Sequence, residues 1–363
     1  MKLNVPGSIR SIKPYVPGKP LKELAREYGI TDSIKLASNE NPLGPSPMAM
    51  EAVRKSLFEL NRYPDAGCHD LVEKLSEKYR VGPENIVIGN GSDDIIGMLS
   101  TVFLNPGDEA ILPSPSFLMY EIAVKTQGAV PLPVPLKNLS IDLDEMKRRI
   151  SPRTRMIFIC NPNNPTGTIV PMDELNAFVR DLPPDIVVVV DEAYIEFARD
   201  ENCRSAVELL NIGTPVATLR TFSKAYGLAG LRVGYGIMAA EIVQFLHRVR
   251  QPFNVNSLAQ IGAVAALEDQ AFFEKTIRLV HDGLAFLHGE LERLRIPYFP
   301  TQANFFLIDV KTNADDVFKR LLEMGVIVRS MSSYGYPGYI RVNVGLFAEN
   351  QRLISALERV SKR

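Results

Sequence analysis

The run Ile186-Val-Val-Val-Val190, which ends at Asp191, constrains the fold of this chain more than any other feature. A strand with one solvated face alternates apolar and polar residues, and this run has no polar member. Unbroken β-branched runs suit strands that are buried on both faces, and such strands are typical of largely parallel sheets covered by helices. The run therefore predicts an α/β fold with a mostly parallel central sheet flanked by helices.

Four shorter apolar runs also end at turns or polar residues. They are Ile86–Ile88, Ala110–Leu112, Met156–Cys160 and Ala217–Leu219. Active sites of open α/β sheets collect at the carboxyl ends of the strands. The segments that follow these runs therefore contain the candidate functional residues.

A smaller α+β lobe is predicted after about Phe272. Six apolar residues there are spaced three and four apart, which places them on one face of a helix packed on a core; they are Ile277, Val280, Leu284, Leu287, Leu291 and Leu294. Strands are expected over Asn304–Val310, Val326–Arg329 and Tyr339–Val344, with a helix over Ala314–Met324.

The length predicts more than one domain, because a chain of 363 residues usually outgrows a single core. We expect an N-terminal arm (1–45) that joins the small domain, a large domain (46–260) and a small C-terminal domain (261–363). The active site is expected between the two domains.

Composition excludes several classes of protein. The 41 Lys+Arg balance 42 Asp+Glu, so the basic excess of a nucleic-acid binder is missing. The cysteines Cys68, Cys160 and Cys203 are scattered and odd in number, which is typical of free thiols in a reducing compartment, and the four histidines lack metal-ligand spacing. No apolar run approaches the ~20 residues of a membrane span. These features predict a cytoplasmic protein that binds no metal, nucleic acid or membrane.

Lys224 lies in the most informative segment, Thr221-Phe-Ser-Lys-Ala-Tyr-Gly-Leu-Ala-Gly-Leu-Arg-Val-Gly-Tyr235. An ordinary surface lysine is the simpler interpretation of the residue alone, but a solvated helix face does not need a glycine-rich, mostly apolar stretch. In a water-poor pocket a lysine has a lowered pKa and forms Schiff bases with carbonyls. Arg232, further along the same segment, could supply a fixed positive charge for a phosphate.

Three further segments each allow two interpretations. Asp191-Glu-Ala-Tyr194 is either a helix cap or a carboxylate that pairs with a cationic ring nitrogen. Asn161-Pro-Asn-Asn-Pro-Thr-Gly167 is either a plain turn or a source of an Asn amide aimed into the cleft. Gly91-Ser-Asp93 offers backbone N–H groups and a helix dipole to an anion, although glycine-containing turns of this kind are common.

Together, three of these segments resemble the fold-type I, pyridoxal-phosphate-dependent aminotransferases. The matching pieces are Asn-Asn-Pro-Thr-Gly167, Asp191-Glu-Ala-Tyr194 and Ser223-Lys-Ala-Tyr-Gly-Leu-Ala-Gly-Leu-Arg232, in the family's order. The resemblance extends over nearly the whole chain, and its most specific part is the Ser-Lys segment with its arginine. It implies a large domain that binds pyridoxal 5'-phosphate, and a smaller α+β domain.

The resemblance also implies a role for each matching residue. Lys224 would form a Schiff base with the cofactor and move the substrate's proton, and Asp191 would keep the pyridine nitrogen protonated. Asn164 and Tyr194 would bind the phenolate oxygen of the ring, and Phe117 would stack on its face. The residues expected at the cofactor phosphate are Ser92, Asp93, Thr221, Ser223, Arg232 and, from a neighbouring subunit, Tyr63.

Within this family the chain resembles the histidinol-phosphate aminotransferases of histidine biosynthesis most closely. The segments that carry this resemblance are Ile12-Lys-Pro-Tyr-Val-Pro-Gly18, Ser38-Asn-Glu-Asn-Pro-Leu-Gly-Pro-Ser-Pro47, Asn61-Arg-Tyr-Pro-Asp65 and Val328-Arg-Ser-Met-Ser-Ser-Tyr-Gly335. The implied reaction exchanges an amino group between L-histidinol phosphate and 2-oxoglutarate, giving imidazole-acetol phosphate and L-glutamate.

A site for both substrates must accept a phosphate or a carboxylate at the same end, and a guanidinium group binds either. By resemblance, Arg341 is the principal anion clamp and Arg329 the second charge, although an arginine in a strand pattern can also be an exposed sheet residue. Tyr15 would close over the substrate. The role of Tyr63 makes a homodimer with shared active sites part of the expectation.

Other interpretations differ in substrate or in class. Aromatic amino-acid aminotransferases and a threonine-phosphate decarboxylase share the scaffold, and the Asn-Glu-Asn-Pro and Met-Ser-Ser-Tyr-Gly signatures favour histidinol phosphate over them. A catalytically silent relative would be expected to lose Lys224 or Asp191, and both are present. A nicotinamide-dependent dehydrogenase would need G-x-G-x-x-G, whereas Gly89-Asn-Gly91 is followed by Ser92-Asp-Asp94.

Overall fold

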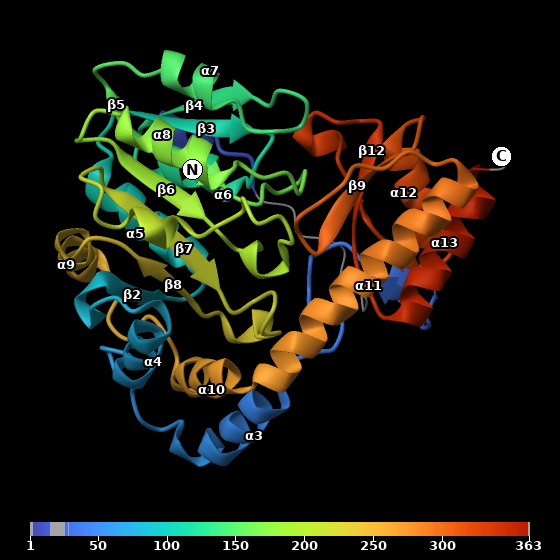
Figure 1. The fold of residues 1–363 in the computed structure, drawn as a ribbon, viewed down its shortest axis with the longest axis horizontal. Coiled ribbons are helices and arrows are strands. Elements are labelled where there is room, and N and C mark those ends of the chain that lie inside the picture. Colours follow the sequence, from blue (N-terminus) through green and yellow to red (C-terminus); the bar gives the residue numbers. More distant parts are fainter. Residues whose placement is uncertain (1–2, 15–25, 28, 362–363) are drawn as a thin grey trace.

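A seven-stranded sheet forms the centre of the larger lobe (Figure 1). The computed structural model describes residues 3–14, 26–27 and 29–361. The strands of this sheet lie in the order β2-β8-β7-β6-β5-β3-β4. Their bounds are β2 (Ile86–Gly89), β3 (Glu109–Ser114), β4 (Val130–Pro135), β5 (Thr154–Cys160), β6 (Val187–Asp191), β7 (Val216–Thr221) and β8 (Gly234–Ile237). Only β8 runs antiparallel to its neighbours, so the predicted mostly parallel sheet is confirmed.

Helices cover both faces of this sheet. On one face lie α5 (Ser92–Phe103), α6 (Met119–Thr126) and α9 (Ala240–Val249); on the other lie α7 (Leu143–Arg148) and α8 (Met172–Arg180). The central run explains this arrangement. Val187 and Val189 pack on the first side, and Val188 and Val190 on the second. Because successive side chains of a strand point to opposite faces, a strand with a core on both sides has no position for a polar residue.

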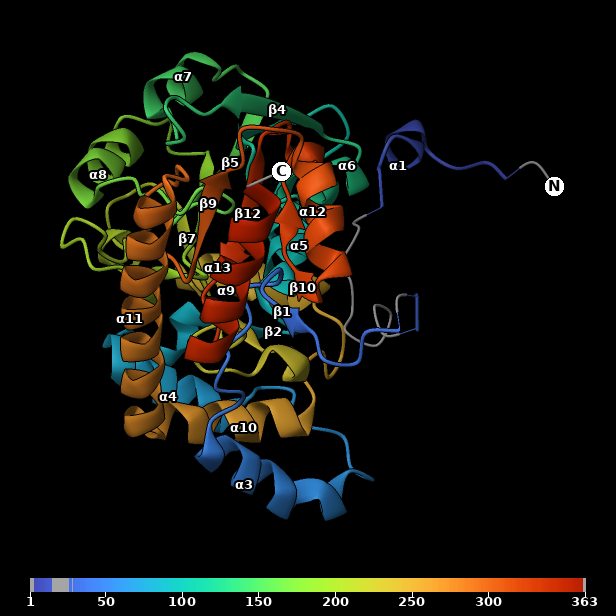
Figure 2. The ribbon, with the colours of Figure 1, turned by 90° about the vertical axis from the view of Figure 1, so that its right-hand side faces the viewer.

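The smaller lobe contains two sheets (Figures 1 and 2). Strands β9 (Phe305–Asp309), β11 (Arg329–Ser330) and β12 (Tyr339–Asn343) form an antiparallel sheet in the order β11-β12-β9. Strands β1 (Ile34–Lys35) and β10 (Val326–Ile327) pair in parallel. The expected single strand over Val326–Arg329 is therefore wrong, because the chain leaves β1 after Ile327 and pairs with β12 from Arg329 onward.

The smaller lobe's helices are α11 (Gln270–Leu294), α12 (Ala314–Glu323) and α13 (Phe347–Ser361). Helix α11 extends from the base of the larger lobe along the smaller one (Figure 1, orange). It confirms the predicted periodic helix, since Val280, Leu284, Leu287 and Leu291 are buried on one face. The domain boundaries at 45/46 and 260/261 stay a prediction.

The remaining helices lie mostly at the base of the larger lobe (Figure 2). Their bounds are α1 (Gly7–Arg10), α3 (Pro47–Ser56), α4 (His69–Tyr79) and α10 (Ser257–Glu268). Short 3-10 turns are η1 (Leu57–Glu59), η2 (Pro83–Asn85), η3 (Ile195–Phe197), η4 (Ala206–Leu209), η5 (Ala229–Leu231) and η6 (Ser332–Tyr334). Over the described ranges, no helix combines the length and apolarity that a membrane crossing requires.

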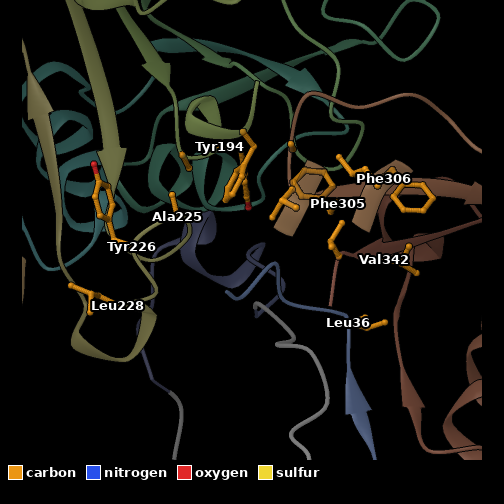
Figure 3. Close-up of a cluster of buried hydrophobic side chains, with 14 of the residues drawn as sticks. Leu36, Tyr194, Ala225, Tyr226, Leu228, Phe305, Phe306 and Val342 are labelled. Carbon is orange, nitrogen blue, oxygen red and sulfur yellow. The ribbon is translucent and has the colours of Figure 1, made fainter. Parts of the chain in front are cut away.

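A hydrophobic cluster joins the two lobes (Figure 3). Tyr194 and Ala225 come from the larger lobe, and Phe305 and Val342 from the smaller one. The rings of Tyr194 and Phe305 meet edge to face with centroids 4.9 Å apart. The lobes therefore share apolar packing directly beside the segments that follow β6 and β7.

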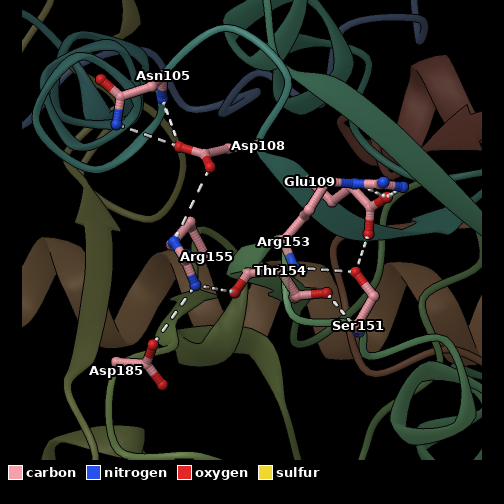
Figure 4. Close-up of polar contacts among 8 residues, drawn as sticks. All are labelled: Asn105, Asp108, Glu109, Ser151, Arg153, Thr154, Arg155 and Asp185. Carbon is pink, nitrogen blue, oxygen red and sulfur yellow. Dashed lines mark hydrogen bonds and ion pairs between the residues drawn. The ribbon is translucent and has the colours of Figure 1, made fainter.

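Polar contacts fix the opposite, amino ends of two central strands (Figure 4). Glu109, at the start of β3, accepts from Arg153 Nε at 2.9 Å and from Ser151 Oγ at 2.5 Å. Arg155 in β5 pairs with Asp185 at 3.4 Å. These ionic groups anchor the loops before the strands and lie away from the carboxyl ends, where the candidate site lies.

Candidate active site

A cavity of about 200 Å³ opens at the carboxyl ends of β2, β5, β6 and β7. Asp191 and Thr221 are the last residues of β6 and β7, while Ser92 begins the helix that follows β2. The side chains that line the cavity are Ser38, Glu40, Ser92, Asp93, Phe117, Cys160, Asn164, Asp191, Ala193, Tyr194, Thr221, Ser223, Lys224, Ala229 and Arg232. The structure thus brings ten of the residues predicted for cofactor binding into one cavity.

Lys224 lies just past β7, with Nζ 3.3 Å from the carbonyl oxygen of Ser38 and 5.6 Å from the centre of the Tyr194 ring. Burial, and then the positive charge of Arg341, lowers the pKa of the Lys224 ammonium to about 8. An amine with this pKa has a substantial neutral fraction near neutral pH, which makes it nucleophilic towards a carbonyl carbon. Lys224 is therefore suited to Schiff-base chemistry.

Asp191 is buried at the floor of this cavity. Its Oδ2 accepts from the Tyr120 hydroxyl at 2.7 Å, and its Oδ1 accepts from the backbone N–H of Ala193 at 3.1 Å. Burial raises the pKa of this carboxyl to about 6, against the opposing effect of the two hydrogen bonds. A buried carboxylate of this kind is stabilised by a nearby cation, so it fits the protonated ring nitrogen of the implied cofactor.

Arg341, from the smaller lobe, does not itself line the cavity but contacts Asn164, which does. The guanidinium of this buried residue donates from Nη1 to Asn164 Oδ1 and, at 2.9 Å, from Nη2 to the carbonyl oxygen of Ala37. Tyr194 is also buried, and its hydroxyl accepts from Asn39 Nδ2 at 3.0 Å. Burial raises the pKa of the Tyr194 hydroxyl, which keeps it a neutral hydrogen-bond donor.

Five of the six residues predicted for a phosphate line the cavity, and two of them, Ser92 and Asp93, belong to the first turn of α5. Gly91 precedes this helix with φ +83°, and a Cβ at Gly91 would lie 2.5 Å from Arg232 Nη2. Arg232 Nη2 lies 3.8 Å from Asp93 Oδ2 and is partly exposed. Open N–H groups at a helix N-terminus together with a guanidinium form a cradle for a phosphate dianion. The close approach of Arg232 explains why the chain has glycine at this position.

Three predicted residues lie elsewhere or outside the described residues. Tyr63 is 81% exposed and stacks on Phe253 with centroids 4.6 Å apart, so it does not reach the cavity of its own chain. Arg329 is the register partner of Arg341 on adjacent strands and does not line the cavity. Tyr15 falls outside the described residues.

The sequence analysis missed several site residues. Ser38 and Glu40 line the cavity, and Asn39 between them holds Tyr194. Their segment was noticed only as a family signature, although its density of polar residues beside Pro42 could have indicated a site. Tyr120 gave no such signal, because a buried tyrosine in a helix is usually part of the core.

Comparisons with known proteins agree with this geometry. The model of the family "Aminotransferase class I and II" matches residues 31–357. The chain is 49% identical to histidinol-phosphate aminotransferase of Desulfotalea psychrophila, over 98% of this chain and 95% of that protein. It is 47% identical to histidinol-phosphate aminotransferase of Moorella thermoacetica, over 97% and 92% of the two chains.

Two solved structures have a similar fold. Histidinol-phosphate aminotransferase from Sinorhizobium meliloti, in complex with pyridoxal-5'-phosphate, superposes with a TM-score of 0.91 at 26% identity, covering 100% of this chain and 98% of that one. A double mutant of Thermus thermophilus aspartate aminotransferase gives a TM-score of 0.85 at 25% identity, covering 99% and 100%. Both proteins match over 98% or more of their length, so the similarity includes both lobes.

Proposed function

This chain belongs to the class I and II aminotransferases, and from that premise we propose that it exchanges an amino group between L-histidinol phosphate and 2-oxoglutarate. The products are imidazole-acetol phosphate and L-glutamate, as a step of histidine biosynthesis. The observation that carries the choice of substrate is the 49% identity to a histidinol-phosphate aminotransferase over nearly the full length of both chains. The cofactor is pyridoxal 5'-phosphate.

When bound, pyridoxal 5'-phosphate supplies an electron sink for the carbanion that forms at the amino-acid carbon. Asp191 would hold a negative charge at the ring nitrogen of the bound cofactor, and its burial would strengthen that ionic pairing. Lys224 Nζ, whose pKa is lowered to about 8, is the base that takes the proton from the substrate carbon and returns it. Ser92, Asp93, Thr221, Ser223 and Arg232 are the residues proposed to hold the phosphate, with Phe117 against the ring.

The two arginines of the smaller lobe are proposed to recognise the substrate's anionic end. Arg329 and Arg341 are paired in register across β11 and β12, so both charges belong to one rigid sheet. A guanidinium fork binds a phosphate or a carboxylate bidentately, and a second nearby charge suits the phosphate's extra negative charge. This arrangement supports a site that alternates between histidinol phosphate and glutamate.

We also propose a homodimer in the cytoplasm. Apolar side chains around η1 are strongly exposed, with Phe58 at 93% and Leu60 at 56%, and Tyr63 lies beside them in the sequence. Exposed apolar groups of this kind favour a protein interface. A partner on this surface would bring Tyr63 to the neighbouring cofactor phosphate. All three cysteines are free thiols, which supports a reducing compartment.

A panel of half-reactions tests the proposed substrate. The purified protein loaded with pyridoxal 5'-phosphate is mixed with histidinol phosphate, phenylalanine or threonine phosphate, and the cofactor absorbance is followed in a stopped-flow instrument. We expect conversion to be fastest with histidinol phosphate. Faster conversion with phenylalanine would indicate an aromatic aminotransferase, and release of carbon dioxide from threonine phosphate would indicate a decarboxylase. The Lys224→Ala variant is the control and should show neither the lysine-dependent band nor turnover.

A further inference from the structure

Asn39 connects the cavity with the smaller lobe through buried hydrogen bonds. Its side-chain Nδ2 lies 3.0 Å from the Tyr194 hydroxyl. Its backbone N–H donates to Asn343 Oδ1 at 3.0 Å, and its carbonyl oxygen accepts from Asn304 Nδ2 at 3.2 Å. All three asparagines are nearly inaccessible to solvent. The position of the Asn39 amide is therefore determined by β12 and by the segment before β9.

The backbone conformation of Asn39 also restricts what can stand there. Its φ is +56°, in the left-handed region that asparagine tolerates better than most residues. The side-chain Oδ1 is buried and makes no hydrogen bond with the described residues. The bond from Nδ2 to Tyr194 is therefore the hydrogen bond that this side chain makes with the described residues.

The direction of this hydrogen bond determines what Tyr194 can do. A carboxamide nitrogen only donates, so the Tyr194 oxygen must be the acceptor. Asn39 therefore does not accept a hydrogen bond from the Tyr194 hydroxyl, and no other acceptor for this hydroxyl is found among the described residues. Tyr194 lines the cavity, so its proton is available to an acceptor that binds there.

We propose that Asn39 is a positioning residue that, by donating to Tyr194, leaves the Tyr194 proton for the phenolate oxygen of the cofactor. This inference rests on the proposed function, because it needs the cofactor to be bound beside Tyr194. The hydrogen bond from Tyr194 stabilises the phenolate, and so lowers the pKa of the chromophore formed with Lys224. Asn39 thus contributes to reactivity without contacting the substrate's reacting atoms.

The isosteric variant Asn39→Asp tests the direction of the bond. A carboxylate only accepts hydrogen bonds, so Asp at this position accepts the hydrogen bond from the Tyr194 hydroxyl. The phenolate oxygen of the cofactor then loses Tyr194 as its hydrogen-bond donor. The absorbance of the holoenzyme is measured as a function of pH, which gives the pKa of the Schiff base formed with Lys224. We expect this pKa to rise by about one unit, which corresponds to the free energy of one charge-assisted hydrogen bond. Affinity of the apoenzyme for pyridoxal 5'-phosphate, measured by fluorescence, should fall several-fold.

The negative charge of the new carboxylate also raises the pKa of the chromophore, because it attracts the protonated form. The same substitution in a variant without the Tyr194 hydroxyl separates this charge effect from the loss of the hydrogen bond. In Tyr194→Phe, the Asn39→Asp substitution should cause much less of the shift, because no hydroxyl remains to be redirected. An equal shift with and without the Tyr194 hydroxyl, or no shift in Asn39→Asp, would overturn the proposal.

If Asn39→Asp does not fold, Asn39→Gly tests the positioning role alone, since glycine accepts φ +56° and removes the group that orients the Tyr194 hydroxyl without adding charge. Its shift should be smaller, upward, and again absent in Tyr194→Phe; a shift that persists there would contradict the proposal. A failure of the proposed function would appear differently. In that case the wild-type holoenzyme itself would show no lysine-dependent band or no reaction with histidinol phosphate.

Discussion

The Tyr120 hydroxyl, which comes from α6, donates to Asp191 Oδ2 at 2.7 Å and opposes the effect of burial on the pKa of that carboxyl. The ring of Tyr120 is fixed by Phe158, which stacks on it at 4.8 Å, and by Phe117, whose edge contact lies at 5.6 Å. Since packing holds the ring, the hydroxyl can be removed without disturbing the core. Tyr120 therefore offers a direct test of how Asp191 is kept ionised.

In Tyr120→Phe, the pKa of Asp191 should rise further above about 6, because only the carboxylate form benefits from the donated hydrogen bond. Asp191 must be ionised to pair with the ring nitrogen, so activity should be lost at a higher pH on the acid side. The acid limb of the kcat/KM profile is expected to move up by about one pH unit, the value of one hydrogen bond to a charge.

Tyr235→Phe is the matched control for this prediction. Tyr235 is equally buried, but its hydroxyl bonds to Tyr79 at 2.6 Å and not to Asp191. The control should leave the acid limb where it is in the wild type. An acid limb that moves equally in both variants would show that the hydroxyl of Tyr120 has no specific effect on Asp191.

Some residues of the cavity could be predicted from the sequence, and others could not. Asp191 could be predicted because it ends an apolar strand, and Lys224 because it lies just after another strand in a glycine-rich, mostly apolar segment. Asn39 and Tyr120 act through partners far away in the chain, Tyr194 and Asp191 respectively. Contacts of this kind depend on how the lobes and helices pack, which local sequence does not specify.

At the level of elements, the first turn of α5 depends on the absence of a side chain at Gly91. Its φ of +83° opposes any other residue, and a Cβ there would lie 2.5 Å from Nη2 of the flexible Arg232 side chain, which would have to move. Gly91→Ala should therefore displace Arg232 or strain the turn, at a cost of about 1–3 kcal/mol. We expect the Kd of pyridoxal 5'-phosphate to rise about tenfold or more, measured by fluorescence titration of the apoenzyme.

The same helix contains a control. Gly97 lies in the middle of α5, and a Cβ there would meet no atom within 4 Å. Gly97→Ala should leave cofactor affinity unchanged and stabilise the helix by about 0.5–1 kcal/mol. If Gly91→Ala bound the cofactor as tightly as Gly97→Ala, the turn would not be part of the phosphate site.

A buried ionic network links β6 to β7 behind the cavity. Arg220, next to Thr221, donates from Nε to Glu192 at 2.8 Å and from Nη1 to Glu196 at 3.2 Å. Glu192, next to Asp191, is fully buried and also accepts from Ser205 Oγ at 2.9 Å. The last residue of each strand is thus a proposed cofactor residue, and a member of this network stands next to it in the sequence.

Glu192→Gln should destabilise the protein strongly, because the buried positive charge of Arg220 is then paired with Glu196 alone among the two carboxylates. We expect a loss of about 3–5 kcal/mol in the free energy of unfolding, measured by urea titration of the apoenzyme. Glu51→Gln, which breaks an exposed pair with Arg54, should leave the urea midpoint unchanged. A Glu192→Gln variant as stable as that control would mean that the network does not hold β6 and β7 together.

Two strands of the central sheet, β4 and β8, could not be predicted from the sequence, for physical reasons. In β4, Pro131, Pro133 and Pro135 argue against a strand, because proline has no N–H to donate to a neighbouring strand. The prolines are tolerated because β4 lies at the edge of the sheet and pairs on one side only. In β8, Gly234 and Gly236 weaken the strand pattern, yet a Cβ at Gly234 would lie 2.5 Å from the backbone nitrogen of Ser92. The glycines of β8 permit a close approach that the local pattern could not reveal.

On the scale of the whole molecule, segment 38–46 connects both lobes around the cavity. Asn41 Nδ2 donates to the carbonyl oxygen of Ala225, beside Lys224, and to Thr276 Oγ1 of α11. Ser46 Oγ donates to Asp269 at 2.6 Å, at the start of the same helix. The α/β class followed from the valine run, but this connection depends on contacts between residues more than 180 positions apart. Such contacts are fixed only when the complete chain folds.

The proposed dimer predicts that two variants, each inactive or weak alone, restore activity when they share a dimer. If Tyr63 of one subunit completes the site that contains Lys224 of the other, each site needs two chains. A Lys224→Ala homodimer should be inactive, and a Tyr63→Ala homodimer should bind the cofactor weakly. In a mixed dimer, however, Lys224 of the Tyr63→Ala subunit meets an intact Tyr63 from its partner, which restores one of the two sites.

Mixing the two variants after mild dissociation tests this arrangement. Random reassociation gives about half mixed dimers with one competent site each, so turnover should recover to about a quarter of the wild-type value. Because Tyr63 is 81% exposed in one chain, its substitution should not unfold the subunit, and the recovery can be attributed to assembly. Turnover that stays at the average of the two separate variants, at a protein concentration where sedimentation shows mixed dimers, would mean that each chain builds its site alone.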